Sequence, residues 1–201
     1  MREVKAIGQR VLLDEGFTEA AWKETLKRDR WDICHIASHF DFRGSEIESG
    51  LLLGDGRKLT LERLKLLPQD AFASISLITL SACQTATQDT DRSRGIVENF
   101  SVLAQRKGAG AVLASLWSVD DEATASLMVE FYRRWRCGEG KAQALQGAQL
   151  ALLKGEAPPL GAKRGIESGT LPPPDAAPYP ASETLRHPYY WAPFNLYGNT
   201  K

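Results

Sequence analysis

Three short apolar runs, separated by stretches with helical spacing, most constrain what this chain can fold into. Each run is short enough to be a buried strand, and they span residues 31–39, 76–83 and 111–117. Capping residues, among them Thr18 and Thr60, and apolar spacing predict helices over residues 18–28, 61–66, 95–107, 121–136 and 141–154. Strands and helices that alternate in this way predict an α/β fold with a mostly parallel sheet.

The remaining segments carry weaker signals. Residues 11–13 and 51–56 read as short strands, the second of them entering an Asp55-Gly56 turn. Residues 85–94 are polar and read as a loop, and residues 155–182 hold most of the ten prolines and read as a long mobile surface loop. The aromatic stretch 187–198 predicts a final strand, which Pro193 places at an edge or a bulge.

Composition excludes several classes of protein. A length of 201 residues suggests one domain, and the 25 basic and 25 acidic residues cancel, which argues against nucleic acid or an anionic membrane surface as a partner. No apolar stretch approaches the roughly 20 residues that span a bilayer, and the first residues lack a signal-peptide core. Three cysteines do not suggest a disulfide framework, so a reducing, cytoplasmic setting is expected.

His39 and Cys83 stand where the first two apolar runs end. Chemistry in open parallel sheets gathers at the carboxyl ends of the strands, so neighbouring strands would bring this imidazole and this thiol together. A histidine favours the thiolate of a nearby cysteine, and it can protonate a leaving amine afterwards. The backbone N–H groups of Cys83 and Phe40 are candidates for stabilising an oxyanion, where such donors contribute about 3 kcal/mol each.

Other interpretations of these residues stay open on the sequence alone. A cysteine after a strand is most often a packing residue, and a histidine there is often structural. His35 and Cys34 lie inside the first run and are expected to belong to the core or its support, whereas Cys137 ends a helix and is expected at the surface. The histidines and cysteines lack a compact zinc spacing, so no metal is expected.

An acidic pair, Asp120 and Asp121, follows the third run. A carboxylate at this edge of the sheet would suit a basic substrate side chain. The alternative is a helix start, because Ser118 to Asp121 fits a capping box and acids stabilise helix N-termini.

Four segments together resemble the signature blocks of CHAT domains, which are bacterial caspase-like domains related to separase. They occur in the family's order over residues ~10–199. The segments are HIASHF at 35–40, LSACQT at 80–85, GAVLASLWSVDD at 110–121 and HPYYWAPF at 187–194.

The resemblance implies a caspase-like three-layer sandwich and a cysteine endopeptidase that needs no cofactor and acts on a protein or peptide. The family's catalytic histidine matches His39 and its nucleophile matches Cys83. An acid in the third block helps related proteases bind a basic residue before the scissile bond, which favours Asp121 and, less strongly, Asp120. Many members have glycine after the histidine, whereas Phe40 keeps the N–H but is expected to crowd the site.

The resemblance also implies that the chain is incomplete at its N-terminus. Such domains begin with one more strand and helix, and residues 1–8 read as the end of that helix. Helical repeats often found upstream in such proteins are absent, so a preceding segment or a partner chain is expected to recruit and regulate. The alternative function is a catalytically inactive or truncated interaction module. A nucleotide-binding domain is disfavoured, because the chain has no glycine-rich phosphate loop.

Overall fold

The computed structural model describes residues 12, 14–28, 30–41, 45, 47–84, 90–117, 119, 121–156 and 183–201. The expectations for residues 1–8, for Val11 and Leu13, and for a mobile loop over 157–182 lie outside this part of the chain. Two compact units are present. The sheet unit comprises Leu12–Ser118 with Tyr197–Asn199, and the C-terminal unit includes Val119–Leu196 with Thr200–Lys201.

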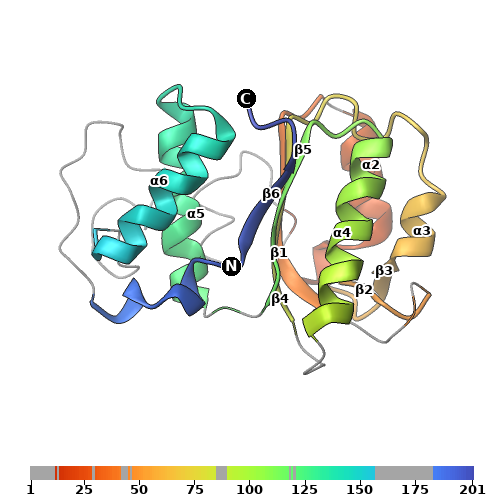
Figure 1. Ribbon diagram of the computed structural model, residues 1–201. Helices are drawn as coiled ribbons and strands as arrows, with labels where there is room; N and C mark the ends of the chain where they lie inside the picture. The colour runs from red at the N-terminus through yellow and green to blue at the C-terminus, as the bar shows by residue number, and fades with distance from the viewer. Residues whose placement is uncertain are drawn as a thin grey trace. The chain divides into compact units, whose positions relative to one another are not determined.

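Six strands form one sheet in the order β3-β2-β1-β4-β5-β6 (Figure 1). Their bounds are β1 Ile33–Asp41, β2 Gly50–Leu52, β3 Lys58–Thr60, β4 Leu77–Gln84, β5 Ala111–Ser115 and β6 Phe194–Gly198. The three apolar runs therefore form β1, β4 and β5, which pair in parallel, and β6 closes the strand order at an edge. This α/β architecture confirms the predicted fold class and is compatible with a caspase-like sandwich.

The strands β2 and β3 form an antiparallel hairpin beside β1. Its turn contains the predicted Asp55-Gly56, with Gly56 at φ 80° and the Asp55 carboxylate accepting the N–H of Arg57 at 3.1 Å. The sequence did not predict β3 as a strand. Only Leu59 of its three residues is apolar, so there is too little alternation to read.

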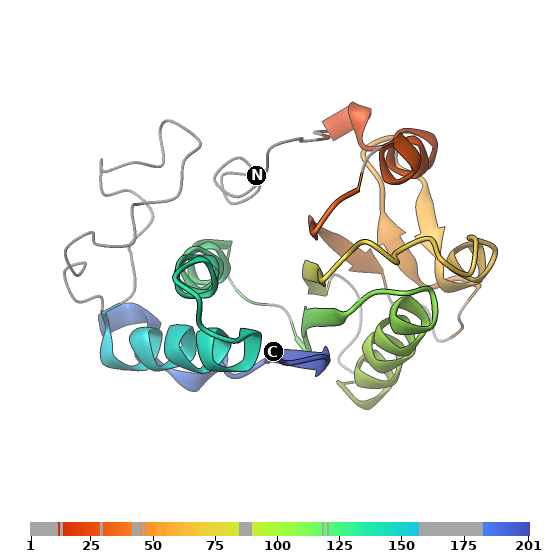
Figure 2. The ribbon, with the colours of Figure 1, turned by 90° about the horizontal axis from the view of Figure 1, so that it is seen from above.

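Helices α2 (Glu19–Arg28), α3 (Leu61–Lys65) and α4 (Thr90–Arg106) lie on one face of the sheet unit, and a short 3-10 turn, η1 (Asp14–Gly16), precedes them (Figures 1 and 2). The predicted caps are confirmed, since the hydroxyl of Thr18 accepts the N–H of Ala21 and that of Thr60 accepts the N–H of Arg63. The loop predicted over 85–94 is wrong for residues 90–94, which start α4. That first turn is wholly polar, so apolar spacing cannot detect it.

The core of the sheet unit is built from alternate positions of the central strands. Side chains in a strand alternate between the two faces of the sheet, so one parity faces the core and the other faces away from it. In β1, β4 and β5 the core-facing positions carry even numbers. The buried core residues at these positions are Ile36, Phe40, Ile78, Leu80, Val112 and Ala114, and the helices contribute Trp22, Leu61, Leu64, Val97, Phe100 and Ala104.

The C-terminal unit contains α5 (Asp121–Arg136) and α6 (Lys141–Lys154), both with the bounds that the sequence predicts. Gly155 ends α6 at φ 75°, which suits a glycine cap. Two 3-10 turns, η2 (Glu183–Arg186) and η3 (Pro188–Tyr190), precede β6. No helix among the described residues is both long enough and apolar enough to cross a membrane.

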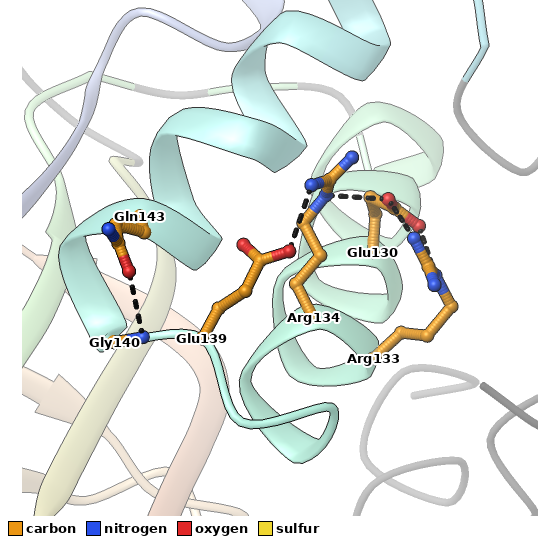
Figure 3. Close-up of polar contacts among 6 residues, drawn as sticks. All are labelled: Glu130, Arg133, Arg134, Glu139, Gly140 and Gln143. Carbon is orange, nitrogen blue, oxygen red and sulfur yellow. Dashed lines mark hydrogen bonds and ion pairs between the residues drawn. The ribbon is translucent and has the colours of Figure 1, made fainter.

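An ion cluster holds the end of α5 (Figure 3). The buried carboxylate of Glu130 accepts from Arg133 at 2.6 and 2.8 Å and from Arg134 at 2.8 Å, and Arg134 also pairs with Glu139 at 3.2 Å. Gly147 of α6 makes room for this arrangement, because a Cβ there would lie 2.5 Å from the Arg134 guanidinium. The two helices therefore approach closely where a glycine and an arginine meet.

Candidate active site

His39 and Cys83 are register partners in the sheet. Strands β1 and β4 pair in parallel over eight positions, from Ile33 with Leu77 to Phe40 with Gln84, and His39 pairs with Cys83. Neighbouring strands lie about 4.8 Å apart, so the two backbone positions are adjacent. The sequence places both residues where their strands end. The structure keeps them inside, because β1 runs to Asp41 and β4 to Gln84.

The His39 position belongs to the face of the sheet that points away from the core of the sheet unit. The preceding positions on that face are His35 and Ala37, whose register partners are Thr79 and Ser81. His39 is exposed, whereas Thr79 and Ser81 are buried. This row of hydroxyl residues under the His39 and Cys83 positions is a feature that the sequence reasoning missed. The alternation of Thr79, Ser81 and Cys83 with apolar residues is the signal that could have found it.

Phe40 occupies the opposite face from His39. Its side chain is 4% exposed and belongs to the core cluster with Trp22 and Phe72. The expectation that its bulk crowds the site is therefore wrong, because neighbouring strand residues face opposite sides of the sheet. Phe40 pairs with Leu51 on one side and with Gln84 on the other, so its backbone lies within the sheet. Its role as an oxyanion donor stays a prediction, as does that of Cys83.

The other two cysteines have different surroundings. Burial raises the pKa of the Cys34 thiol to about 11. At neutral pH this thiol is protonated, and a protonated thiol is a poor nucleophile. Cys137 follows the last turn of α5 and is exposed. Both placements agree with what the sequence predicts.

Asp121 is the first residue of α5 and is exposed, and Asp120 lies outside the described residues. A carboxylate in the first turn fits the favourable interaction of acids with a helix N-terminus, which is the structural alternative for this pair. Asp121 belongs to the C-terminal unit, whereas His39 and Cys83 belong to the sheet unit. A substrate-binding role for Asp121 and Asp120 stays a prediction.

No group of three or more histidine, cysteine, aspartate or glutamate side chains in the described part of the chain could hold a metal ion. The candidate groups at this edge of the sheet are the pair His39 and Cys83 and the backbone around it. An imidazole beside a thiol suits acyl transfer, in which the sulfur attacks a carbonyl and the histidine moves protons.

Comparison with known proteins gives one family. No curated protein matched the chain. The family model of the CHAT domain matches residues 1–199, nearly the whole chain, and includes β1 with His39 and β4 with Cys83. The chain therefore belongs to the CHAT domain family, which is associated with caspase-like peptidases.

Proposed function

We propose that this chain is a caspase-like cysteine endopeptidase in which Cys83 is the nucleophile and His39 the general base. The observation that supports it is the register of β1 and β4, which pairs these two residues in a chain of this family. The pKa of the Cys34 thiol is raised to about 11, so this thiol is a poor nucleophile at neutral pH, which supports Cys83 rather than Cys34 in that role.

The reaction begins when His39 accepts the thiol proton of Cys83 and the sulfur attacks a peptide carbonyl carbon. The backbone N–H groups of Cys83 and Phe40 then stabilise the negative charge on the carbonyl oxygen. The imidazolium of His39 gives its proton to the leaving amine, and the C–N bond breaks to leave a thioester. Water attacks this thioester with His39 again acting as base, which releases the acid and restores the thiol.

The substrate is a protein or peptide, and Asp121 with Asp120 is proposed to bind a basic side chain before the scissile bond. The exposed position of Asp121 at the start of α5 supports this role. Asp121→Asn should then reduce turnover of peptides with arginine before the scissile bond by tenfold or more and leave peptides with a neutral residue there unaffected. Equal loss for both peptides would overturn the proposed specificity.

A thiol-directed peptidyl probe tests the proposal. The probe carries arginine next to its reactive group, and peptide mapping identifies the labelled cysteine. We expect the label on Cys83, no label in Cys83→Ala, and labelling slowed by roughly 10²-fold or more in His39→Ala. Cys34→Ala and Cys137→Ser are the matched controls and should label like the wild type. Equal labelling of Cys137 and Cys83, or a folded chain without turnover, would instead favour a non-catalytic interaction module.

A further inference from the structure

One ion pair joins the end of β1 to the hairpin beside it. The ammonium nitrogen Nζ of Lys58, in β3, lies 2.5 Å from Oδ2 of Asp41, the last residue of β1. The same ammonium donates to the carbonyl oxygen of Glu48 at 3.4 Å, in the segment between β1 and β2. Lys58 therefore connects β3 with the end of β1 and with the segment that precedes β2. Its contact in β1, Asp41, lies two residues from His39.

The strand registers place this pair on the His39 face of the sheet. Phe40, Leu51 and Leu59 form one row across β1, β2 and β3, and all three are buried in the core. Adjacent positions alternate between faces, so Asp41 and Lys58 lie on the other face. His39 shares that face because it precedes Asp41 by two residues. The ion pair and the candidate base thus occupy the same side of the same strand end.

Gly50 explains how Lys58 reaches Asp41. This glycine pairs with Asp41 on one side and with Thr60 on the other. A Cβ at Gly50 would lie 2.7 Å from the carbonyl oxygen of Leu59, so only glycine allows β2 and β3 to approach this closely. Lys58 pairs with Leu52, two residues from Gly50 along β2, so its long side chain reaches Asp41 diagonally, past the position at which Gly50 has no side chain.

The ion pair of Lys58 with Asp41 adds little to the stability of the whole fold. The side chains of Lys58 and Asp41 are 31% and 14% exposed, and ion pairs of this partly exposed kind contribute little to the free energy of unfolding. Among the described residues, β1 pairs with β2 at two positions, and the hydroxyl of Ser38 donates to the carbonyl oxygen of Leu52 at 2.6 Å. The Lys58 ion pair adds a third connection at the end of the strand that carries His39, next to these contacts.

We propose that Lys58 and Asp41 are positioning residues that fix the end of β1 and, through it, the imidazole of His39. The kinetic consequence rests on the proposed function, whereas the structural consequence does not. A misplacement of about 1 Å in a catalytic group lowers a rate by up to roughly 100-fold. Loss of a partly exposed ion pair, in contrast, changes the free energy of unfolding little. Loss of the pair should therefore affect the site much more than the fold.

The kinetic test compares Lys58→Met with Arg57→Met. Arg57 pairs with Asp55 at 2.7 Å in the adjacent turn. Arg57→Met therefore removes an ion pair next to Lys58 in the chain that does not involve Asp41, which makes it the matched control. We expect Lys58→Met to lower kcat about tenfold with KM unchanged, and to change the unfolding temperature by no more than about 4 °C. Lys58→Arg should restore kcat, and Arg57→Met should match the wild type. Equal kcat in Lys58→Met and Arg57→Met would overturn the proposal.

A second measurement does not depend on activity. The chain has three histidines, so its imidazole proton NMR signals are few enough to assign by substitution. We expect Lys58→Met and Asp41→Asn to shift or broaden the His39 signal and to leave those of His35 and His187 unchanged. If the wild type turns over no peptide, the proposed function fails while this measurement still decides the positioning role. An unchanged His39 signal in both variants would overturn it.

Discussion

Replacing Phe40 by alanine separates a core role from a role in crowding the candidate site. The Phe40 side chain is 4% exposed and belongs to the same buried core cluster as Trp22 and Phe72. Phe→Ala substitutions in such cores cost about 3–5 kcal/mol, because the transfer free energy is lost and a cavity remains. For a chain of this length each kcal/mol lowers the unfolding temperature by about 2–4 °C. We therefore expect Phe40→Ala to unfold roughly 10 °C below the wild type.

Urea unfolding followed by tryptophan fluorescence measures the loss in free energy of unfolding, and thermal unfolding with the same signal measures the drop in temperature, since Trp22 lies in the same core. Phe40→Leu keeps most of the volume and should cost less than about 1.5 kcal/mol. His39→Ala, one residue away but exposed, is the matched control and should stay within about 0.5 kcal/mol of the wild type. Wild-type stability in Phe40→Ala, together with faster labelling of Cys83, would refute the reasoning and restore the crowding interpretation.

Two further predictions concern charged groups. Glu130→Gln should lower the free energy of unfolding by about 2 kcal/mol in urea titrations, because it leaves two partly buried arginine partners without their carboxylate. The control is Glu24→Gln, which breaks an exposed pair and should change the free energy of unfolding by less than about 0.5 kcal/mol. Burial raises the pKa of Glu19, but hydrogen bonds and charges of Lys23 and Arg63 outweigh it and hold this pKa below its usual 4.5. The wild type should therefore be about 1 kcal/mol more stable than Glu19→Gln above pH 4.5 and lose this advantage as the pH falls through the lowered pKa; equal stability at pH 7 would contradict this.

Elements with strong local signals follow from the sequence, and those without them do not. The helices α5 and α6 have long apolar stripes and clear ends, so the sequence predicts both sets of bounds. The hydroxyl of Thr60 likewise marks the start of α3. The hairpin strand β3 and the polar first turn of α4 leave no periodic apolar signal, because their places are set by tertiary pairing and by burial further along the chain.

The candidate site shows where sequence reasoning stops and pairing geometry begins. The alternation of apolar residues places His39 and Cys83 on the same face of their strands, away from the core. That alternation repeats every two residues, so it does not distinguish the observed register from one in which β1 is shifted against β4 by two positions. Such a slip would pair His39 with Ser81 and leave every apolar side chain on its own face. The register that pairs His39 with Cys83 is therefore information the apolar pattern lacks, and only the three-dimensional pairing of the strands supplies it.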